Sequence, residues 1–233
     1  MRKIKEAAKR IITMLSNEKD GNILKFTTAH TGKMTGMYSL STSTLLNPNC
    51  REHAKVKGSI CEKCYAETML NNKFYRNLKK AVEHNTVILT GQVLPDENLP
   101  LINAHSFRFE AFGDLINETQ VENYFNIAKK NHETYFALWT KNPWIIDSAI
   151  KGRGIQKPDN LIIIYSSPLI NVEISLFAMQ KKFSFIDKVF TVYSDETEAD
   201  KKNAVINCGK RNCLTCLKCY RKNGINEINE LLK

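Results

Sequence analysis

The sequence predicts a single α/β domain, in which parallel strands close fully or partly into a (βα) barrel of the TIM type. From residue 106 to residue 193, extended apolar segments alternate with segments of helical periodicity, which is the pattern of parallel βαβ units. The segment 161–165 (LIIIY) is continuously apolar, as in strands that are covered on both faces. The length of 233 residues fits one barrel domain.

The first part of the chain is predicted to be helical on either side of one extended segment. Residues 1–17 place apolar side chains on one helical stripe, and residues 66–89 repeat them every four positions (Leu70, Phe74, Leu78, Val82), so both segments are predicted helices. Residues 36–46 (GMYSLSTSTLL) are rich in β-branched and apolar side chains and are predicted to be extended. Residues 1–35 would form an N-terminal helical extension of the domain.

The second part supplies the strand–helix alternation. Pro143 is a favoured residue in the first turn of a helix, and apolar runs such as KVFTVY are typical of strands. The predicted strands are 106–112, 134–139, 160–165 and 188–193, and the predicted helices are 118–131, 143–150 and 172–181. The whole chain therefore contains about five or six parallel strands, followed by a cysteine-rich segment over 204–233.

The composition indicates a globular protein with a basic surface. The formal net charge is +10, so the surface could bind a nucleic acid or another polyanion, unless the lysines are simply solvated. No apolar stretch approaches the ~20 residues that span a bilayer, and no leader pattern follows the basic N-terminus. We therefore expect a cytoplasmic protein that does not bind a membrane.

All seven cysteines lie in two tight groups with the spacings C-x10-C-x2-C and C-x4-C-x2-C-x2-C. In a reducing cytosol such groups are better read as metal ligands than as disulfides. Zinc and iron–sulfur clusters both use closely spaced thiolates, so both remain candidates: zinc completed by His53 or another residue at the first group, and structural zinc at the second. The predicted metal ligands are Cys50, Cys61 and Cys64 in the first group and Cys208, Cys213, Cys216 and Cys219 in the second.

Polar residues follow the predicted strands. They are Gly113-Asp114, Thr140-Lys141-Asn142, Ser166-Ser167 and Ser194-Asp195. Because the carboxyl ends of parallel strands open onto one face, where α/β enzymes bind their ligands, we expect these residues to form a site together with the first cysteine group. Glu110 alternates with Phe109, so it either points inward, where a charge is costly without a partner, or lies on an exposed strand face.

Several motifs carry a family resemblance. The segment Cys61-Glu62-Lys63-Cys64-Tyr65-Ala66, preceded by Cys50, resembles the C-x-x-C-Y-A motif of a group of uncharacterised phage- and plasmid-borne proteins, which look like relatives of radical S-adenosylmethionine enzymes. The segments FRF-x-x-FGDL from Phe107, LWTKNP from Leu138 and SSP from Ser166, and the C-terminal cysteine group, also match. The resemblance extends from about Gly36 to Tyr220.

The resemblance implies two four-iron, four-sulfur clusters. The first group would hold three irons and leave the fourth for S-adenosylmethionine, from which one electron releases a 5′-deoxyadenosyl radical. Ferredoxin or flavodoxin would be the electron donor. The resemblance places Gly113-Asp114 at the amino group of S-adenosylmethionine, although a Gly-Asp pair at a strand end can equally be a turn that caps the next helix. Lys141 could meet a carboxylate or phosphate, or could merely begin a loop. The predicted catalytic residues are Asp114, Lys141 and Glu110, and the predicted cofactor-binding residues are Gly113, Asp114, Tyr65, Thr140 and Ser166. The chain departs from the radical enzymes in its ten-residue interval after Cys50 and in having Gly-Asp in place of Gly-Gly-Glu.

Three functions follow from these observations. The first is a radical S-adenosylmethionine-like enzyme with two clusters, for which a nucleic acid is one candidate substrate. The second is an iron–sulfur protein without S-adenosylmethionine that transfers electrons or binds a ligand. The third is a zinc-stabilised nucleic-acid-binding protein. Iron content separates the third function from the other two.

Overall fold

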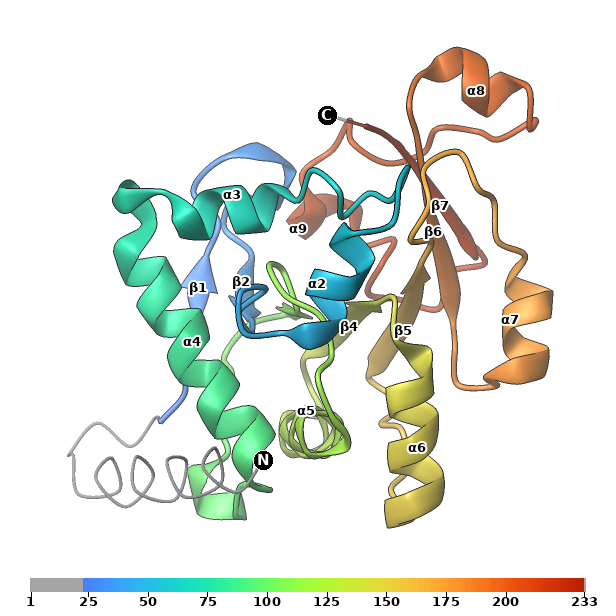
Figure 1. Cartoon of the computed structure of the whole chain (residues 1–233). Helices are drawn as coiled ribbons and strands as arrows, with labels where there is room; N and C mark the ends of the chain where they lie inside the picture. The colour runs from blue at the N-terminus through green and yellow to red at the C-terminus, as the bar shows by residue number, and fades with distance from the viewer. Residues whose placement is uncertain (1–22, 233) are drawn as a thin grey trace.

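A computed structural model describes residues 23–232. It is an α/β structure with one seven-stranded sheet whose strands follow one another in chain order, from β1 to β7 (Figure 1). β1 is antiparallel to β2, and every other neighbouring pair is parallel. The sheet is open, with β1 and β7 as its edges. The strands are β1 (Thr27–Thr28), β2 (Tyr38–Leu40), β3 (Ser106–Phe109), β4 (Tyr135–Thr140), β5 (Leu161–Ser166), β6 (Lys188–Tyr193) and β7 (Glu227–Leu231).

Helices connect the successive strands. The α-helices are α2 (Pro48–Ala54), α3 (Tyr65–Asn71), α4 (Arg76–Gly91), α5 (Glu118–Lys130), α6 (Pro143–Arg153), α7 (Leu176–Lys182), α8 (Glu196–Asp200) and α9 (Cys213–Cys216). Short 3₁₀ helices are η1 (Gly32–Met34), η2 (Lys73–Tyr75) and η3 (Asp96–Asn98). Within residues 23–232, no helix has the length and apolar character needed to cross a membrane.

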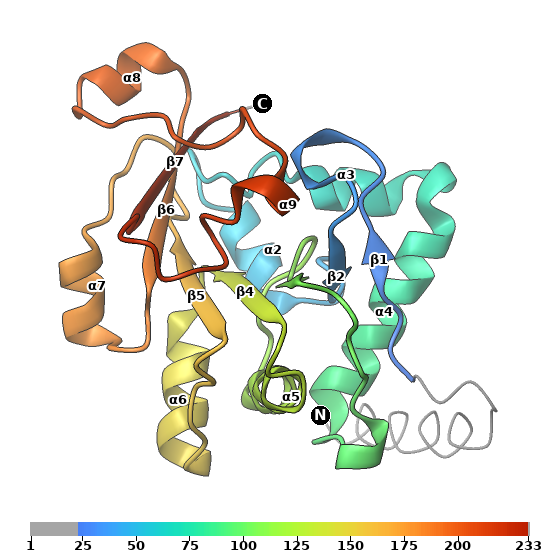
Figure 2. The same ribbon diagram turned by 180° about the vertical axis from the view of Figure 1, so that it is seen from behind.

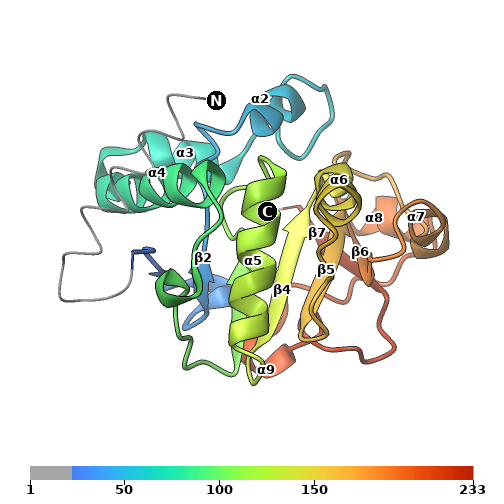
Figure 3. The ribbon, with the colours of Figure 1, turned by 90° about the horizontal axis from the view of Figure 1, so that it is seen from below.

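One face of the sheet packs against α4, α5, α6 and α7 and forms the main core (Figure 3). The two-residue period of the strands decides which side chains reach it. Phe136 and Leu138 of β4, and Leu161 and Ile163 of β5, point into this core and are fully buried. Burial of a large apolar side chain contributes about 1.5–3 kcal/mol, so this face supplies most of the hydrophobic stabilisation.

The C-terminal segment covers the opposite face (Figure 2). Here Ala137 and Trp139 of β4 contact Tyr220 and Cys219, and Ile162 and Ile164 of β5 pack with Ile228. The alternate residues of the same strands are thus buried on both sides, which explains the continuously apolar sequence of β5. Residues 204–232 of the predicted segment 204–233 lie on the sheet as a second layer and supply its last strand.

The structure confirms the strand–helix alternation and corrects some boundaries. β2 covers only part of the predicted segment 36–46. The predicted helix 66–89 is divided, because Asn72 has an extended backbone and its side chain accepts a hydrogen bond from the backbone N–H of Phe74. β3 ends at Phe109 because Glu110 has a positive φ of 55°. The predicted helix 1–17 lies outside the described residues. The described part of the extension 1–35 contains β1 and η1.

Candidate functional site

The first cysteine group lies at the carboxyl end of the sheet, on and between α2 and α3. Asn47 caps α2 by accepting a hydrogen bond from the backbone N–H of Asn49 (2.9 Å), and Pro48 follows in the first turn, so Cys50 is placed at the start of the helix. Cys64 is the N-cap residue of α3. The three cysteines share one cavity of about 310 Å³, lined by Thr44, Leu45, Cys50, Arg51, Cys61, Cys64, Glu67 and Asn71.

The loop that carries Cys61 is tied to the loop after β5. The backbone N–H of Ile60 donates to the carbonyl of Pro168 (2.9 Å), and Ser59 and Leu169 form an antiparallel bridge. The Ser59 hydroxyl in turn accepts a hydrogen bond from the backbone N–H of Cys61 (3.0 Å). These contacts hold the loop before Cys61 against the end of β5. The backbone of Cys61 is therefore held in place despite the long spacing from Cys50.

Asp114 joins the ends of β3 and β4. Its carboxylate accepts hydrogen bonds from the Thr140 hydroxyl (2.6 Å) and from the backbone N–H groups of Leu115 (2.7 Å) and Lys141 (3.0 Å). The Asn47 side chain donates to the Asp114 carbonyl (2.8 Å). Asp114 is only 5% exposed. The predicted convergence is therefore present for the ends of β3 and β4, with Asp114 as the residue that positions the Thr140-Lys141 turn.

Lys141 brings a positive charge to the three thiols. Burial lowers the pKa of Lys141, but the charges of Cys61, Asp114 and the other two cysteines outweigh it and leave the pKa above its ordinary value. Within residues 23–232, the ammonium group donates no hydrogen bond, whereas the backbone N–H is held by Asp114. Burial has the opposite effect on acidic groups and raises the pKa of the Cys50 and Cys61 thiols. The arrangement combines a positive charge with the three cysteines of the first group.

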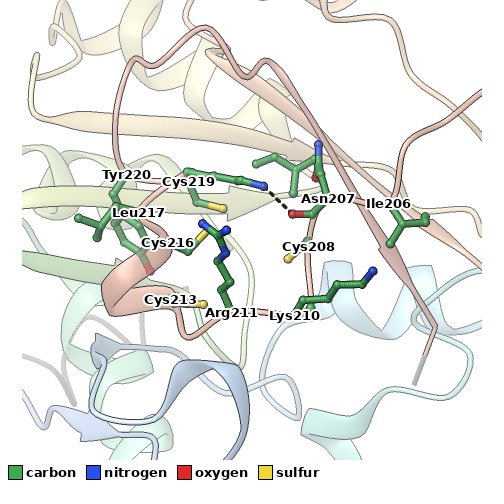
Figure 4. A pocket seen from close by; sticks show the side chains of 13 residues that line it. Ile206, Asn207, Cys208, Lys210, Arg211, Cys213, Cys216, Leu217, Cys219 and Tyr220 are labelled. Atoms are coloured by element: carbon green, nitrogen blue, oxygen red, sulfur yellow. Dashed lines mark hydrogen bonds between the residues drawn. The ribbon is translucent and has the colours of Figure 1, made fainter.

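The second cysteine group lines a cavity of about 340 Å³ on the opposite face of the sheet (Figure 4). Figure 4 shows the sulfur atoms of Cys208, Cys213, Cys216 and Cys219 around a common space. Burial raises the pKa of Cys219 to about 12 and also raises that of Cys213. A Lys218 hydrogen bond to the Asn207 carbonyl (2.8 Å) closes one side.

Two cations come to the second group from distant parts of the chain. Lys33 of η1 forms an ion pair with Glu230 of β7, and its ammonium lies 3.4 Å from the Cys208 sulfur. The Arg108 guanidinium of β3 stacks on the Trp139 ring, 3.8 Å from its centroid. Both charges favour the thiolate form of Cys213 and partly oppose the effect of burial on its pKa.

A family model described as GP88, gene product 88, matches residues 11–230. The chain belongs to the gene product 88 family. The matched range contains both cysteine groups, strands β1 to β6 and all but the last residue of β7. No curated protein and no solved structure matches the chain. The family name states no activity, so the function of this member rests on the chemistry of the site.

Glu110, a predicted catalytic residue, lies beside the site and does not line its cavity. It is 2% exposed and accepts hydrogen bonds from the Thr42 backbone and hydroxyl (3.1 and 2.9 Å), from the Gln120 amide (2.6 Å) and from the Tyr124 hydroxyl. Burial raises the pKa of Glu110 to about 7. A Cβ atom on Gly113 would lie 2.5 Å from this carboxylate. The absence of a side chain at Gly113 therefore lets the turn pack closely against Glu110 and Thr42.

The other predicted cofactor-binding residues have different surroundings. The Tyr65 hydroxyl donates to the Ala111 carbonyl, and its ring contacts Phe112 at 6.4 Å between centroids, so Tyr65 joins α3 to the loop after β3. The Thr140 hydroxyl donates its hydrogen bond to the Asp114 carboxylate. Ser166 is buried at the end of β5 and does not line the cysteine cavity. The exposed pair Ser194-Asp195 caps α8, where Asp195 accepts from the Glu198 backbone N–H (2.9 Å).

The donor set is suited to iron–sulfur clusters, because such clusters are held by cysteine thiolates and each cavity gathers one complete cysteine group. His53, the fourth ligand of the zinc alternative, faces Asn142, with 3.1 Å between its Nε2 atom and Oδ1 of the amide, and does not line the cavity. Over residues 23–232, no three His, Cys, Asp or Glu side chains are arranged to hold a single metal ion.

Sequence reasoning missed several residues that build the site. Asn47 connects α2 to the loop after β3, and Thr42 connects the loop after β2 to Glu110. Lys33 reaches the second group from the other end of the chain. The Asn47-Pro48 pair was readable as an N-cap followed by a first-turn proline. The Lys33 contact has no local signal, because 175 positions separate it from Cys208.

Proposed function

We propose that this protein is an iron–sulfur protein with two four-iron clusters. Cys50, Cys61 and Cys64 would hold three irons of the first cluster and leave one iron open to an added ligand, whereas the four C-terminal cysteines would close the coordination of the second. The observation that carries the proposal is the single cavity lined by all three cysteines of the first group; Lys141 adds a positive charge that interacts with these cysteines, whose charges raise its pKa.

The charge of Lys141 has a clear role in this proposal. Three thiolates around an iron–sulfur core form an anionic group, and an anion in a half-buried site needs a compensating cation. Asp114 fixes the turn that presents this cation by accepting the Lys141 backbone N–H. At the second cavity, Lys33 and Arg108 compensate the thiolates in the same way.

We infer that the protein is a radical S-adenosylmethionine-like enzyme. The family resemblance of the first cysteine group supports this, and the chain-order succession of β2 to β7 is also the strand order of a partial (βα) barrel. Lys141 could pair with the carboxylate of S-adenosylmethionine. When bound, this cofactor would supply the chemistry of hydrogen-atom abstraction. We assign Asp114 to positioning, because protein donors occupy its carboxylate.

Such an enzyme also requires a low-potential electron donor of the ferredoxin or flavodoxin type. A reducing cytosol would keep the seven thiols available for cluster assembly. The cysteine-lined cavity beside Lys141 would then be the place where the substrate meets the first cluster.

The cluster assignment is tested by anaerobic reconstitution with iron and sulfide. Wild type should bind about eight irons per chain, and the double variants Cys61→Ser/Cys64→Ser and Cys213→Ser/Cys216→Ser should each keep about four. These two variants are matched controls for each other, because each leaves the other cavity intact. A colourless protein that takes up stoichiometric zinc in place of iron would overturn the proposal.

The S-adenosylmethionine assignment has its own test. Reconstituted wild type should bind S-adenosylmethionine and, with dithionite, release 5′-deoxyadenosine, whereas Lys141→Met should bind it more weakly while retaining its iron. Lys151→Met, on the exposed face of α6, is the control for loss of a lysine. Full iron loading with no S-adenosylmethionine binding would leave an iron–sulfur protein and reject the radical enzyme.

A further inference from the structure

The corner between α3 and α4 exposes aromatic side chains among cations. Phe74 is 82% exposed and Tyr75 41% exposed, although large aromatic side chains are usually buried. The Lys73 ammonium lies 5.5 Å from the centroid of the Phe74 ring. Residues 68–82 contain four cations and no acidic residue; the cations are Lys73, Arg76, Lys79 and Lys80.

The local backbone holds these side chains outward. Asn72 interrupts the helix with an extended backbone, and its side chain accepts a hydrogen bond from the Phe74 N–H (3.0 Å). η2 then turns the chain into α4, so that Phe74 and Tyr75 lie on the outside of the corner. A continuous helix would carry Phe74 on the same stripe as buried Leu70 and Val82. The cap therefore creates the exposed aromatic pair.

This corner adjoins the first cysteine cavity. Glu67 and Asn71 of α3 line the cavity together with the cysteines, and Asn71 is only three positions before Phe74. α3 thus begins directly after Cys64 and ends at Asn71, next to the corner; Figure 1 shows α3 leading into α4 there. A flexible ligand that stacks on Phe74 could place a neighbouring unit at the cavity mouth.

We infer that the α3–α4 corner binds single-stranded nucleic acid and presents one nucleotide to the first cysteine cavity. Base stacking on an exposed aromatic ring combined with phosphate contacts by nearby cations is the usual mode of single-strand binding. A membrane surface shares the attraction to cations and aromatics and is the competing ligand in the test. The inference rests on the proposed function only for the role of the cavity.

Fluorescence anisotropy with the full-length protein tests the binding. The probes are labelled single strands of about 15 nucleotides, oligo(dT) and oligo(U), which separate DNA from RNA as the source. Phe74→Ala should weaken binding about 5- to 100-fold, the effect of losing one stacked base. Replacing Lys73, Lys79 and Lys80 by Gln should reduce the slope of log K against log salt concentration by about 2, at about 0.7 per single-strand phosphate contact.

The chain offers a matched control on α7. Phe177 is 68% exposed, and the Lys181 ammonium lies 4.4 Å from its ring centroid, but Figures 1 and 2 place α7 at the other end of the sheet from α4. Phe177→Ala should leave the affinity unchanged. Equal affinity of Phe74→Ala and wild type, or an equal loss in Phe177→Ala, would overturn the inference.

Two further measurements separate the alternatives. Binding to vesicles rich in phosphatidylglycerol, lost in Phe74→Ala and without any single-strand binding, would assign the corner to a membrane and reject the inference. Strand binding is measured on both iron-free and reconstituted protein. Phe74-dependent strand binding in a protein that takes up no iron would support this inference while rejecting the proposed function.

Discussion

A buried carboxyl group makes the stability of this protein sensitive to pH. Glu110 is 2% exposed, and its hydrogen-bond donors come from Thr42, Gln120 and Tyr124, which are all neutral. Burial raises its pKa from 4.5 to about 7, because the hydrogen bonds from Tyr124 and Thr42 offset only part of the lost hydration. We therefore examine the replacement Glu110→Gln, which cannot ionise.

The sign and magnitude follow from proton linkage. The folded state binds the Glu110 proton more tightly than the unfolded state, so its contribution is fully present below the unfolded pKa of 4.5 and is lost as the pH rises through about 7. The full pKa shift from 4.5 to about 7 corresponds to about 3.5 kcal/mol, at about 1.4 kcal/mol per pH unit. Between about pH 5 and pH 8, wild type should lose about 2.5 kcal/mol relative to Glu110→Gln.

Urea unfolding of the iron-free protein at a series of pH values measures this difference. In Glu110→Gln the side-chain NH2 group faces the Thr42 N–H, which donates to the carboxylate in wild type. Two donors then face each other, and this lowers the free energy of unfolding by an amount that does not vary with pH. Glu118→Gln is the control, because the pKa of Glu118 is lowered by hydrogen bonds from its own backbone and from Ser148, so its linkage has the opposite sign. A difference between wild type and Glu110→Gln that stays constant from about pH 5 to pH 8 would refute the reasoning.

Three other substitutions give separate tests. Gly113→Ala should cost about 1–3 kcal/mol of unfolding free energy, because its Cβ would lie 2.5 Å from two oxygen atoms; Gly152→Ala, with nothing within 4 Å, should be neutral or stabilising, as chemical denaturation would show. Asn47→Ala removes the cap of α2 and a buried hydrogen bond, so a melting curve should show about 2–3 kcal/mol of destabilisation; unchanged stability would contradict this role. Lys141→Met should lower the midpoint potential of the reconstituted first cluster in a redox titration, because the cation favours the more negative reduced state; Lys151→Met should not.

The pattern of the sequence predicted the sheet well where apolar periodicity is strong. β4, β5 and β6 lie within a residue or two of their predicted bounds, and α5 ends one residue early. These elements are buried, and the spacing of their apolar side chains reflects that burial. The helix 66–89 was wrong at Asn72, where a side-chain hydrogen bond to the backbone outcompetes helical continuity. β7 (EINEL) was missed, since an edge strand with charged residues has a weak pattern.

The prediction of the site also succeeded where the signal was local and failed where it depended on the folded chain. The spacing of the cysteines identified the three thiols that share the first cavity, and the polar strand ends identified Asp114, Thr140 and Lys141, which meet behind it because parallel strands bring their carboxyl ends together. Whether a polar strand-end residue faces the cavity or packs behind it depends on local backbone angles. Glu110, with its positive φ, turns toward α5, and only the folded chain reveals that direction.

The sequence by itself determined the α/β class, the order of the main elements and the two cysteine groups, because periodicity and spacing are local properties of the chain. Tertiary structure alone decided that the sheet is open, that the C-terminal segment covers its second face, and that Lys141 and Lys33 serve different cysteine groups. These are long-range contacts, and their energies depend on burial and on charges brought together from distant positions, for which no short stretch of sequence contains a signal.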